Sequence, residues 1–169
     1  MNIELLNKLE TIDHSFRYKL TIVTNIKFSY TNNDKRKNRS LFETFTKKHL
    51  IHKLSKLTKQ HNKKKDNEFL CIGSFEYRKT DRLIHYHYLF SFIDNSVIKD
   101  YQIILERWKK DKIIYDFELK PYIPYEIYKK DHVECSSFSS YILKEADNEL
   151  FPIPFFSKDL TNLINQKTL

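Results

Sequence analysis

Residues 69–92, FLCIGSFEYRKTDRLIHYHYLFSF, consist of two aromatic and aliphatic runs separated by a short polar segment. This pattern predicts a β-hairpin with its tip at residues 79–82, KTDR. Side chains alternate between the two faces of a strand. We therefore expect a continuous apolar face made by Ile84, Tyr86, Tyr88, Phe90 and Phe92. His85 and His87 then lie on the opposite face.

Three side chains on that opposite face form a candidate metal site. With the tip centred between residues 80 and 81, Glu76 lies ~5 Å across from His85, and Ser74 lies opposite His87. The two histidines stand ~7 Å apart along the strand. Two imidazoles and one carboxylate are typical of divalent metal sites with open coordination positions. Imidazole rings that are simply hydrogen-bonded are the alternative interpretation.

The composition is that of one folded domain spanning residues 1–169. Hydrophobic residues make up 40% of the chain and aromatic residues 15%, which is enough for a core. The net charge of +8 favours a polyanionic partner, nucleic acid first and an anionic membrane surface second. General solubilising charge is the alternative. Because Gly73 is the single glycine, a glycine-rich phosphate loop, and with it a P-loop NTPase or helicase motor, is excluded.

The cysteines and the apolar runs indicate the compartment. Cys71 and Cys135 are the two cysteines, too few for a disulfide framework, so we expect reduced thiols. No apolar run approaches the length of a transmembrane helix, and the N-terminal residues lack a signal-peptide core. We therefore expect a cytoplasmic protein that makes no use of a membrane.

Hydrophobic periodicity predicts the elements before the hairpin. A short helix is expected at residues 3–9. Residues 16–28 alternate as a long strand with the even-numbered residues inward and basic residues such as Lys19 outward. Residues 29–39 are expected to form a polar, basic loop. The capping box Ser40-Leu41-Phe42-Glu43 then predicts the start of a helix.

The elements after the hairpin follow in the same way. A helix that begins near residue 95 carries Trp108 on its apolar stripe, and we expect this side chain in the core. A strand is expected over 113–119, ended by prolines 121 and 124. A helix over 136–146 has Phe138 and Ile142 inward. The apolar segment 150–156 is expected on the core, followed by a short helix after Ser157.

The helix over 136–146 contains a second chemical motif, Tyr141-Ile142-Leu143-Lys144. Residues three apart lie on the same side of a helix, so the Tyr141 hydroxyl and the Lys144 ammonium can approach one target. Tyrosine can act as a covalent nucleophile, and a neighbouring cation or a metal-bound phosphate favours its phenolate. Of the eleven tyrosines, Tyr141 alone is followed by lysine three residues later. An ordinary amphipathic helix is the alternative.

The strand motif His85-Tyr86-His87 followed by Tyr-x-x-Lys on a later helix resembles the HUH endonuclease family. The closest resemblance is to single-tyrosine Rep proteins, which start rolling-circle replication of small plasmids, phages and viruses. RYKLTIVTNIKF, residues 17–28, sits where that family has its opening strand, and Glu76 sits where it has an acidic metal ligand. The resemblance covers residues 16–146 and includes no helicase domain.

The resemblance implies an α+β fold, ferredoxin-related, with a five-stranded antiparallel sheet and helices packed on one side. It implies that Glu76, His85 and His87 hold Mn²⁺ or Mg²⁺. Tyr141 attacks the scissile phosphate to give a 5′-phosphotyrosyl link and a free 3′-OH, with Lys144 balancing charge. The strand can later be rejoined.

The implied partners are single-stranded origin DNA, a host helicase and a host polymerase, with the protein a monomer or weak dimer. Candidate DNA contacts are the side chains of Lys19, Lys35, Arg36, Lys63, Lys64 and Lys65. Alternatives of the same fold are a plasmid relaxase, a single-tyrosine transposase and a non-cleaving DNA-binding regulator. A zinc hydrolase is the alternative from another enzyme class, although its usual His-Glu-x-x-His motif is absent.

Overall fold

The computed structural model describes residues 3–28, 32–61, 69–91, 95–124, 128–130, 133–135, 142 and 155–166. From residue 16 to residue 121 the strands and helices follow the predicted order. In chain order the elements are α1 (Ile3–Ile12), a 3₁₀ turn (Asp13–Ser15), β1 (Phe16–Lys27), α2 (Asn32–Thr44), a π-helical segment (Phe45–Ile51), α3 (His52–His61), β2 (Cys71–Tyr77), β3 (Leu83–Ser91), α4 (Asn95–Lys110), β4 (Asp116–Pro121), β5 (Tyr128–Lys130), β6 (Val133–Cys135), β7 (Phe155–Phe156) and α6 (Lys158–Asn165).

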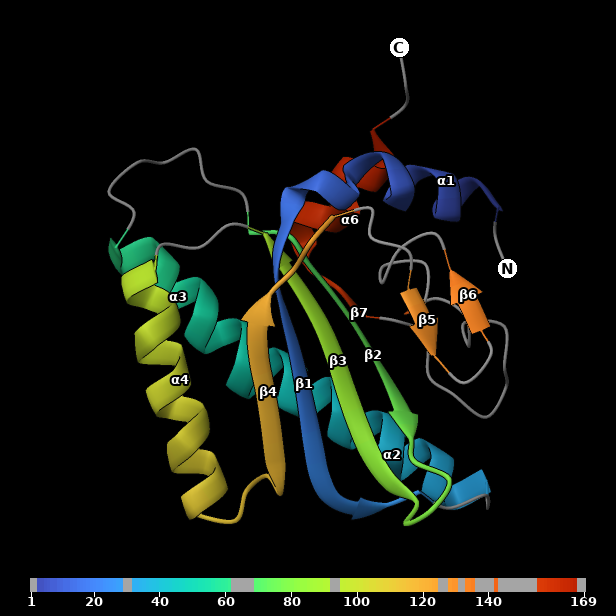
Figure 1. Ribbon diagram of the computed structural model, residues 1–169, viewed down its shortest axis with the longest axis vertical. Coiled ribbons are helices and arrows are strands. Elements are labelled where there is room, and N and C mark those ends of the chain that lie inside the picture. The colour runs from blue at the N-terminus through green and yellow to red at the C-terminus, as the bar shows by residue number, and fades with distance from the viewer. Residues whose placement is uncertain are drawn as a thin grey trace.

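Five strands form one sheet in the order β4-β1-β3-β2-β7 (Figure 1). Each neighbouring pair in this sheet is antiparallel. β1 and β2 therefore run in the same direction, and β3 lies between them in the opposite direction. The predicted α+β class with a five-stranded antiparallel sheet is confirmed. Strands β5 and β6 pair with each other in a separate hairpin.

The hairpin formed by β2 and β3 has the predicted register. Glu76 lies opposite His85, and Ser74 lies opposite His87. This register follows from the alternation of the two strands, because a slip of one residue would turn the apolar face of β3 toward the other side. The two histidines and Glu76 consequently share one face of the sheet.

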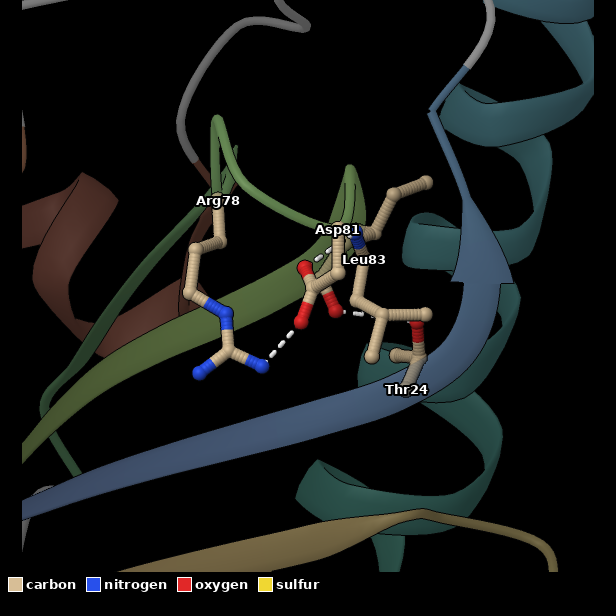
Figure 2. A network of polar contacts seen from close by, with 5 residues as sticks. Thr24, Arg78, Asp81 and Leu83 are labelled. Carbon is tan, nitrogen blue, oxygen red and sulfur yellow. Dashed lines mark hydrogen bonds and ion pairs between the residues drawn. The ribbon is translucent and has the colours of Figure 1, made fainter.

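The tip of this hairpin is fixed by hydrogen bonds from both sides. The Arg78 guanidinium donates to the Asp81 carboxylate, which also accepts from the Leu83 amide at 3.0 Å (Figure 2). Arg82 has a φ of 62°, a left-handed conformation that costs free energy for a residue with a Cβ. The Arg82 carbonyl accepts from the Phe28 amide at 2.7 Å, and the Arg82 guanidinium donates to the Phe28 carbonyl at 2.9 Å. The turn is thus attached to the end of β1.

The main core lies between one face of the sheet and the helices α2, α3 and α4 (Figure 1). Of the predicted apolar face of β3, Ile84, Tyr86, Tyr88 and Phe90 are found here, and Phe92 lies outside the described residues. Cys71, whose thiol is free, and Trp108 also belong to this core. The remaining buried members come from the strands, the helices and the segments between them: Leu20, Ile22, Phe28, Phe42, Leu50, Leu54, Phe69, Phe75, Val97, Tyr101, Leu105 and Ile114.

A second core covers one end of the opposite face, where α1 and α6 lie together (Figure 1). Its buried members are Leu9, Phe16, Leu70, Ile72, Leu89, Ile142 and Leu160. Helices therefore pack on both faces of the sheet, which differs from the expected one-sided packing. The apolar side chains at this end of the face require a cover, and α1 and α6 supply it.

Phe16 was expected on the same face as Leu20, and this expectation is wrong. The pairing of β1 with β3 shifts between Phe16 and Tyr18, which face Ser91 and Phe90 respectively. One extra residue in β1 makes a β-bulge, and a bulge reverses the alternation beyond it. Phe16 therefore packs in the second core, while Leu20 and Ile22 pack in the main core.

Residues 29–39 were expected to form a loop, but α2 already begins at Asn32. Ser40 lies inside this helix and does not cap it. The polar stretch is rich in lysine and arginine, which have good helix propensity, and the Arg39–Glu43 ion pair of 2.9 Å spans one helical turn. α2 begins before Ser40 because these residues favour helical geometry, although they bury little apolar surface.

The strand expected over 113–119 is displaced toward its C-terminus and runs over Asp116–Pro121. The amides of Ile113 and Ile114 instead donate to the Trp108 carbonyl at 2.9 and 3.4 Å. These bonds close the last turn of α4. Ile113 and Ile114 therefore belong to the turn after α4 and not to the strand. Pro121 forms the end of the strand, as expected from its missing amide donor.

The C-terminal predictions fall partly on described residues. Ile142 is helical and 3% exposed in the second core, as predicted, while the rest of the helix expected over 136–146 lies outside the described residues. Phe155 and Phe156 extend the sheet beside β2. The Ser157 hydroxyl accepts from the Leu160 amide at 3.3 Å and caps α6. Among the described helices, none is both long and apolar enough to cross a membrane.

Candidate metal centre

Glu76 from β2 and His85 and His87 from β3 meet on the face of the sheet that α2, α3 and α4 leave uncovered. Their donor atoms all lie within 4.8 Å of one another. The strands place them there because side chains on one face recur every second residue along a strand and lie directly opposite across a pair. The face expected from the sequence is therefore the one that the structure has.

Glu76 and His87 are in direct contact. The Nε2 atom of His87 lies 2.9 Å from Oε1 of Glu76, and their side chains are 7% and 16% exposed. The rings of His85 and His87 have centroids 6.3 Å apart, close to the spacing expected along a strand. The three side chains thus form one compact, partly buried group.

This group fits a divalent cation in both chemistry and spacing. Around a six-coordinate ion with donors at ~2.1 Å, neighbouring donors are about 3 Å apart and opposite donors about 4.2 Å apart. The 2.9 Å between Glu76 and His87 matches neighbouring donors. Donor atoms as far apart as 4.8 Å would need only a small side-chain movement to bind one ion. Two imidazoles and a carboxylate suit first-row cations such as Mn²⁺ and Zn²⁺, and leave positions for a substrate.

Thr21 of β1 supports the group from the adjacent strand and was not among the predicted site residues. It lies opposite His87 in the β1–β3 pair, and its hydroxyl is 3.2 Å from Nδ1 of His87. A hydroxyl can donate or accept, so Thr21 can hold the ring whichever nitrogen carries the proton. Hydrogen bonds of this kind orient histidine ligands in metal sites. The outward-facing position of Thr21 in the alternating first strand was the available signal.

Charged side chains flank the group on the same face. Across the β1–β4 pair, Glu118 lies opposite Thr21, and Lys120 lies opposite Lys19. The Lys120 ammonium is 3.1 Å from the Glu118 carboxylate. Lys19, a predicted DNA contact, therefore lies two residues along β1 from the threonine that supports His87.

Two further predicted DNA contacts lie on an element away from the group. Lys35 and Arg36 were expected in a loop but belong to α2, which packs on the other face of the sheet. They do not lie in a loop because this segment, rich in lysine and arginine, is helical from Asn32 onward. The tract containing Lys63, Lys64 and Lys65 lies outside the described residues.

The two predicted catalytic residues, Tyr141 and Lys144, also lie outside the described residues. Ile142, which the sequence places between them, is buried in the second core, which also contains Leu89 and Ile72. Leu89 follows His87 by two residues on β3, and Ile72 precedes Ser74 by two on β2. The described part of this segment thus packs on the face of the sheet that carries the candidate metal centre.

The described tyrosines differ in their capacity to act as nucleophiles. Burial raises the pKa values of Tyr86, Tyr88 and Tyr101, which opposes formation of the phenolate. Tyr115 is 58% exposed. The Tyr122 hydroxyl donates to both carboxylate oxygens of Asp13, at 2.9 and 3.0 Å. The three buried tyrosines are therefore poor candidates.

Comparisons with known proteins return no match: none among protein-family models, and no significant one among curated proteins or solved structures.

Proposed function

We propose that this chain is a metal-dependent single-stranded DNA nickase and strand transferase of the HUH type. The observation that carries the proposal is the group of Glu76, His85 and His87, with its donor atoms within 4.8 Å of one another. Such a donor set with open positions is suited to holding a phosphodiester beside a cation. The role we infer is that of a replication initiator that starts rolling-circle synthesis.

The topology supports the proposal. The order β1, helix, β2, β3, helix, β4 with the strand sequence β4-β1-β3-β2 is a split βαβ arrangement, as in ferredoxin-like folds. The resemblance to HUH endonucleases implies a five-stranded antiparallel sheet, and this chain has one. Its strand β3 carries His85 and His87 and has a neighbour on each side.

The motif Tyr141-Ile142-Leu143-Lys144 favours Tyr141 as the nucleophile. The next residue in the sequence, Ile142, is buried in the core cluster that also contains Ile72 and Leu89. Tyr86, Tyr88 and Tyr101 are disfavoured by the raised pKa values of their hydroxyls.

The proposed reaction uses the chain's own residues as follows. Glu76, His85 and His87 bind the cation, and a bound Mn²⁺ or Mg²⁺ supplies Lewis-acid polarisation of phosphoryl oxygens. The Tyr141 phenolate attacks phosphorus, the bond from phosphorus to the 3′ oxygen breaks, and that oxygen takes a proton from water. The products are a 5′-phosphotyrosyl ester and a 3′-OH. Lys144 stabilises the phenolate by its positive charge.

Basic side chains beside the centre suit an anionic strand. Lys19 and Lys120 lie opposite each other on neighbouring strands of the same face. Two ammonium groups at this spacing can contact phosphate oxygens of one strand. We assign unwinding of the template to a host helicase and extension of the 3′-OH to a host polymerase.

The test is a denaturing gel of the protein mixed with a random pool of single-stranded DNA, with Mn²⁺ or with EDTA. The proposal predicts an SDS-resistant band of lower mobility with Mn²⁺ only. Tyr141→Phe should lose this band and keep DNA binding in a native gel. Tyr115→Phe, which removes an equivalent hydroxyl from an exposed side chain, is the matched control and should keep it.

Two outcomes count against the proposal. DNA binding without any covalent band, on the pool and on candidate origin sequences, would favour a non-cleaving regulator. Cleavage products without a covalent band would favour a metal-dependent hydrolase that uses the same three ligands.

A further inference from the structure

The positive charge of this chain is concentrated in one helical segment. Residues 32–61 contain nine Lys and Arg side chains and two acidic ones, a net charge of +7 out of the chain's +8. This segment consists of α2, the π-helical segment and α3, and it runs as a continuous helix across one face of the sheet (Figure 1). We call residues 32–61 the basic helix. It lies on the side of the sheet opposite the candidate metal centre.

The buried side of the basic helix follows a strict four-residue step. Asn38, Phe42, Thr46, Leu50 and Leu54 are all buried. In a regular α-helix, four residues advance by about 400°, so such a stripe drifts by about 40° at each step. A π-helical turn contains more residues and compensates for this drift. The π-helical segment Phe45–Ile51 therefore keeps the buried stripe facing the sheet along the helix.

The same geometry aligns the exposed side. Ser40, Thr44, Lys48, His52 and Lys56 repeat at the four-residue step, and each is exposed. Exposed cations flank this stripe at Arg36, Lys37, Lys47 and Lys53. Every side chain in the stripe can donate a hydrogen bond. From Ser40 to Lys56 the stripe extends over about 24 Å at 1.5 Å per residue.

Among the basic side chains that the structure describes on this helix, only Arg39 forms an ion pair, with Glu43. By contrast, Lys109 of α4 is 2.8 Å from the Asp116 carboxylate. An aligned array of hydroxyl, imidazole and ammonium donors is the kind of surface that contacts phosphate oxygens.

We propose that the exposed stripe of the basic helix binds the backbone of double-stranded DNA. A duplex is favoured over a single strand because single-strand surfaces combine cations with aromatic stacking platforms. Among the residues that the structure describes, the exposed large hydrophobic side chains are those of Ile103, Ile113, Tyr115 and Ile123, all outside this helix. An anionic membrane is disfavoured because its binding uses an apolar helix face, and here that face packs in the core.

The experiment measures duplex binding by fluorescence anisotropy in EDTA, so that no metal chemistry takes part. The probes are a blunt duplex of about two helical turns and an oligothymidine strand of equal length. The test variant is Lys48→Gln/Lys53→Gln/Lys56→Gln. The matched control is Lys79→Gln/Lys99→Gln/Lys158→Gln, which removes the same charge from exposed positions elsewhere. Circular dichroism verifies that both variants are folded.

The proposal predicts that the test variant weakens duplex binding at least about tenfold and lowers the slope of log K against log salt by about 2 to 3. The control should change duplex affinity less than about threefold. The oligothymidine affinity should stay nearly unchanged in the test variant. Because the assay contains EDTA, its result does not depend on whether the proposed nicking reaction occurs.

Equal losses of duplex affinity in the test and control variants would overturn the proposal, since general charge would then explain binding. A test variant whose affinity for oligothymidine falls as much as its affinity for the duplex would overturn the preference for a duplex. Wild-type protein that fails to bind the duplex would overturn it as well.

Discussion

Glu76, His87 and Thr21 form a chain of contacts across three strands. Glu76 contacts His87 at 2.9 Å, and Thr21 contacts the other nitrogen of the same ring at 3.2 Å. The imidazole of His87 is thus held on both sides, which is what pre-organises a ligand for a metal ion. The predictions at the scale of single residues concern this chain of contacts.

Glu76→Gln should weaken Mn²⁺ binding by more than about tenfold, because the amide removes the one negative charge among the three ligands. Isothermal titration calorimetry of the purified protein with Mn²⁺ measures the effect. Glu118→Gln is the matched control, since this carboxylate lies on the same face but pairs with Lys120. A Glu76→Gln variant that binds Mn²⁺ like the wild type would exclude Glu76 as a ligand.

Thr21→Val should weaken Mn²⁺ binding by about tenfold to a hundredfold, because valine cannot accept the hydrogen bond from Nδ1–H of His87. Thr21→Ser keeps the hydroxyl and should bind Mn²⁺ nearly as the wild type does. Nitrogen NMR of the His87 ring gives a readout apart from metal affinity: only Thr21→Val should change the tautomer population. If serine and valine behave alike, the hydroxyl has no positioning role.

The three ligands could be predicted because they depend on one local unit, a hairpin with a short turn. Alternation within each strand assigns the faces, and the turn sets the register. Thr21 could not be assigned in this way. Its contact with His87 depends on how β1 pairs with β3, and more than sixty residues separate the two side chains in the chain.

At the scale of elements, the π-helical segment and the hairpin are joined through Tyr88. Its hydroxyl forms a buried hydrogen bond of 2.8 Å with the Thr46 hydroxyl. Its ring lies over Gly73 of β2, where an added Cβ would be 2.6 Å from the ring. The chain's single glycine therefore allows a large side chain to pack directly on the backbone of the neighbouring strand.

Gly73→Ala should destabilise the protein by about 1–3 kcal/mol, the usual cost of overpacking a core. Tyr88 is fully buried, so its ring cannot move aside without displacing its neighbours. Urea denaturation followed by circular dichroism measures the free energy of unfolding. Ser74→Ala, at the next position on the half-buried opposite face, should change it by less than about 0.5 kcal/mol. Equal effects of the two substitutions would contradict the packing argument.

The hairpin tip should make stability depend on pH in the acidic range. The hydrogen bond from Arg78 and that from the Leu83 amide lower the pKa of Asp81. A carboxyl whose pKa is lower in the folded state stabilises the fold above its unfolded pKa of about 3.9. This stabilisation is lost as the pH falls through the folded value.

Asp81→Asn should therefore lower the melting temperature at pH 6, and the difference from the wild type should shrink as the pH falls below 4. Thermal melts of both proteins across this range test the prediction. A difference that stays constant with pH would show that the charge of Asp81 does not contribute.

Elements with strong periodicity could be predicted, whereas their limits depended on contacts that the sequence does not display. α4 carries Val97, Tyr101, Leu105 and Trp108 on one buried stripe, as the spacing indicates. The extension of α2 to Asn32 lacks such a stripe, since most of its residues are polar. The bulge that moves Phe16 to the second core interrupts an alternation that is otherwise unbroken in the sequence.

At the scale of the whole molecule, the sheet separates two surfaces of different chemistry. One face carries the candidate metal centre with Lys19 and Lys120, and the other is covered by the basic helix and α4. Under the two proposals, the first face binds a single strand for cleavage and the second holds a duplex. An origin that contains both forms would engage both surfaces.

The whole-molecule architecture could be predicted only in its central part. The order of strands and helices indicates an antiparallel sheet with helices, and this is found. Strand β7 and the packing of α1 with α6 join the two ends of the chain on one face of the sheet. Contacts between such distant segments leave no periodic signal in either one.

The most direct test of the central claim is mass spectrometry of the protein after incubation with single-stranded DNA and Mn²⁺, followed by nuclease and protease digestion. The account predicts a nucleotide mass attached through phosphate to the peptide that contains Tyr141, absent when EDTA replaces Mn²⁺. No nucleotide-bearing peptide from a sample in which DNA has been cleaved would contradict covalent nicking. A nucleotide on another tyrosine, such as Tyr122, would contradict the assignment of Tyr141 as the nucleophile.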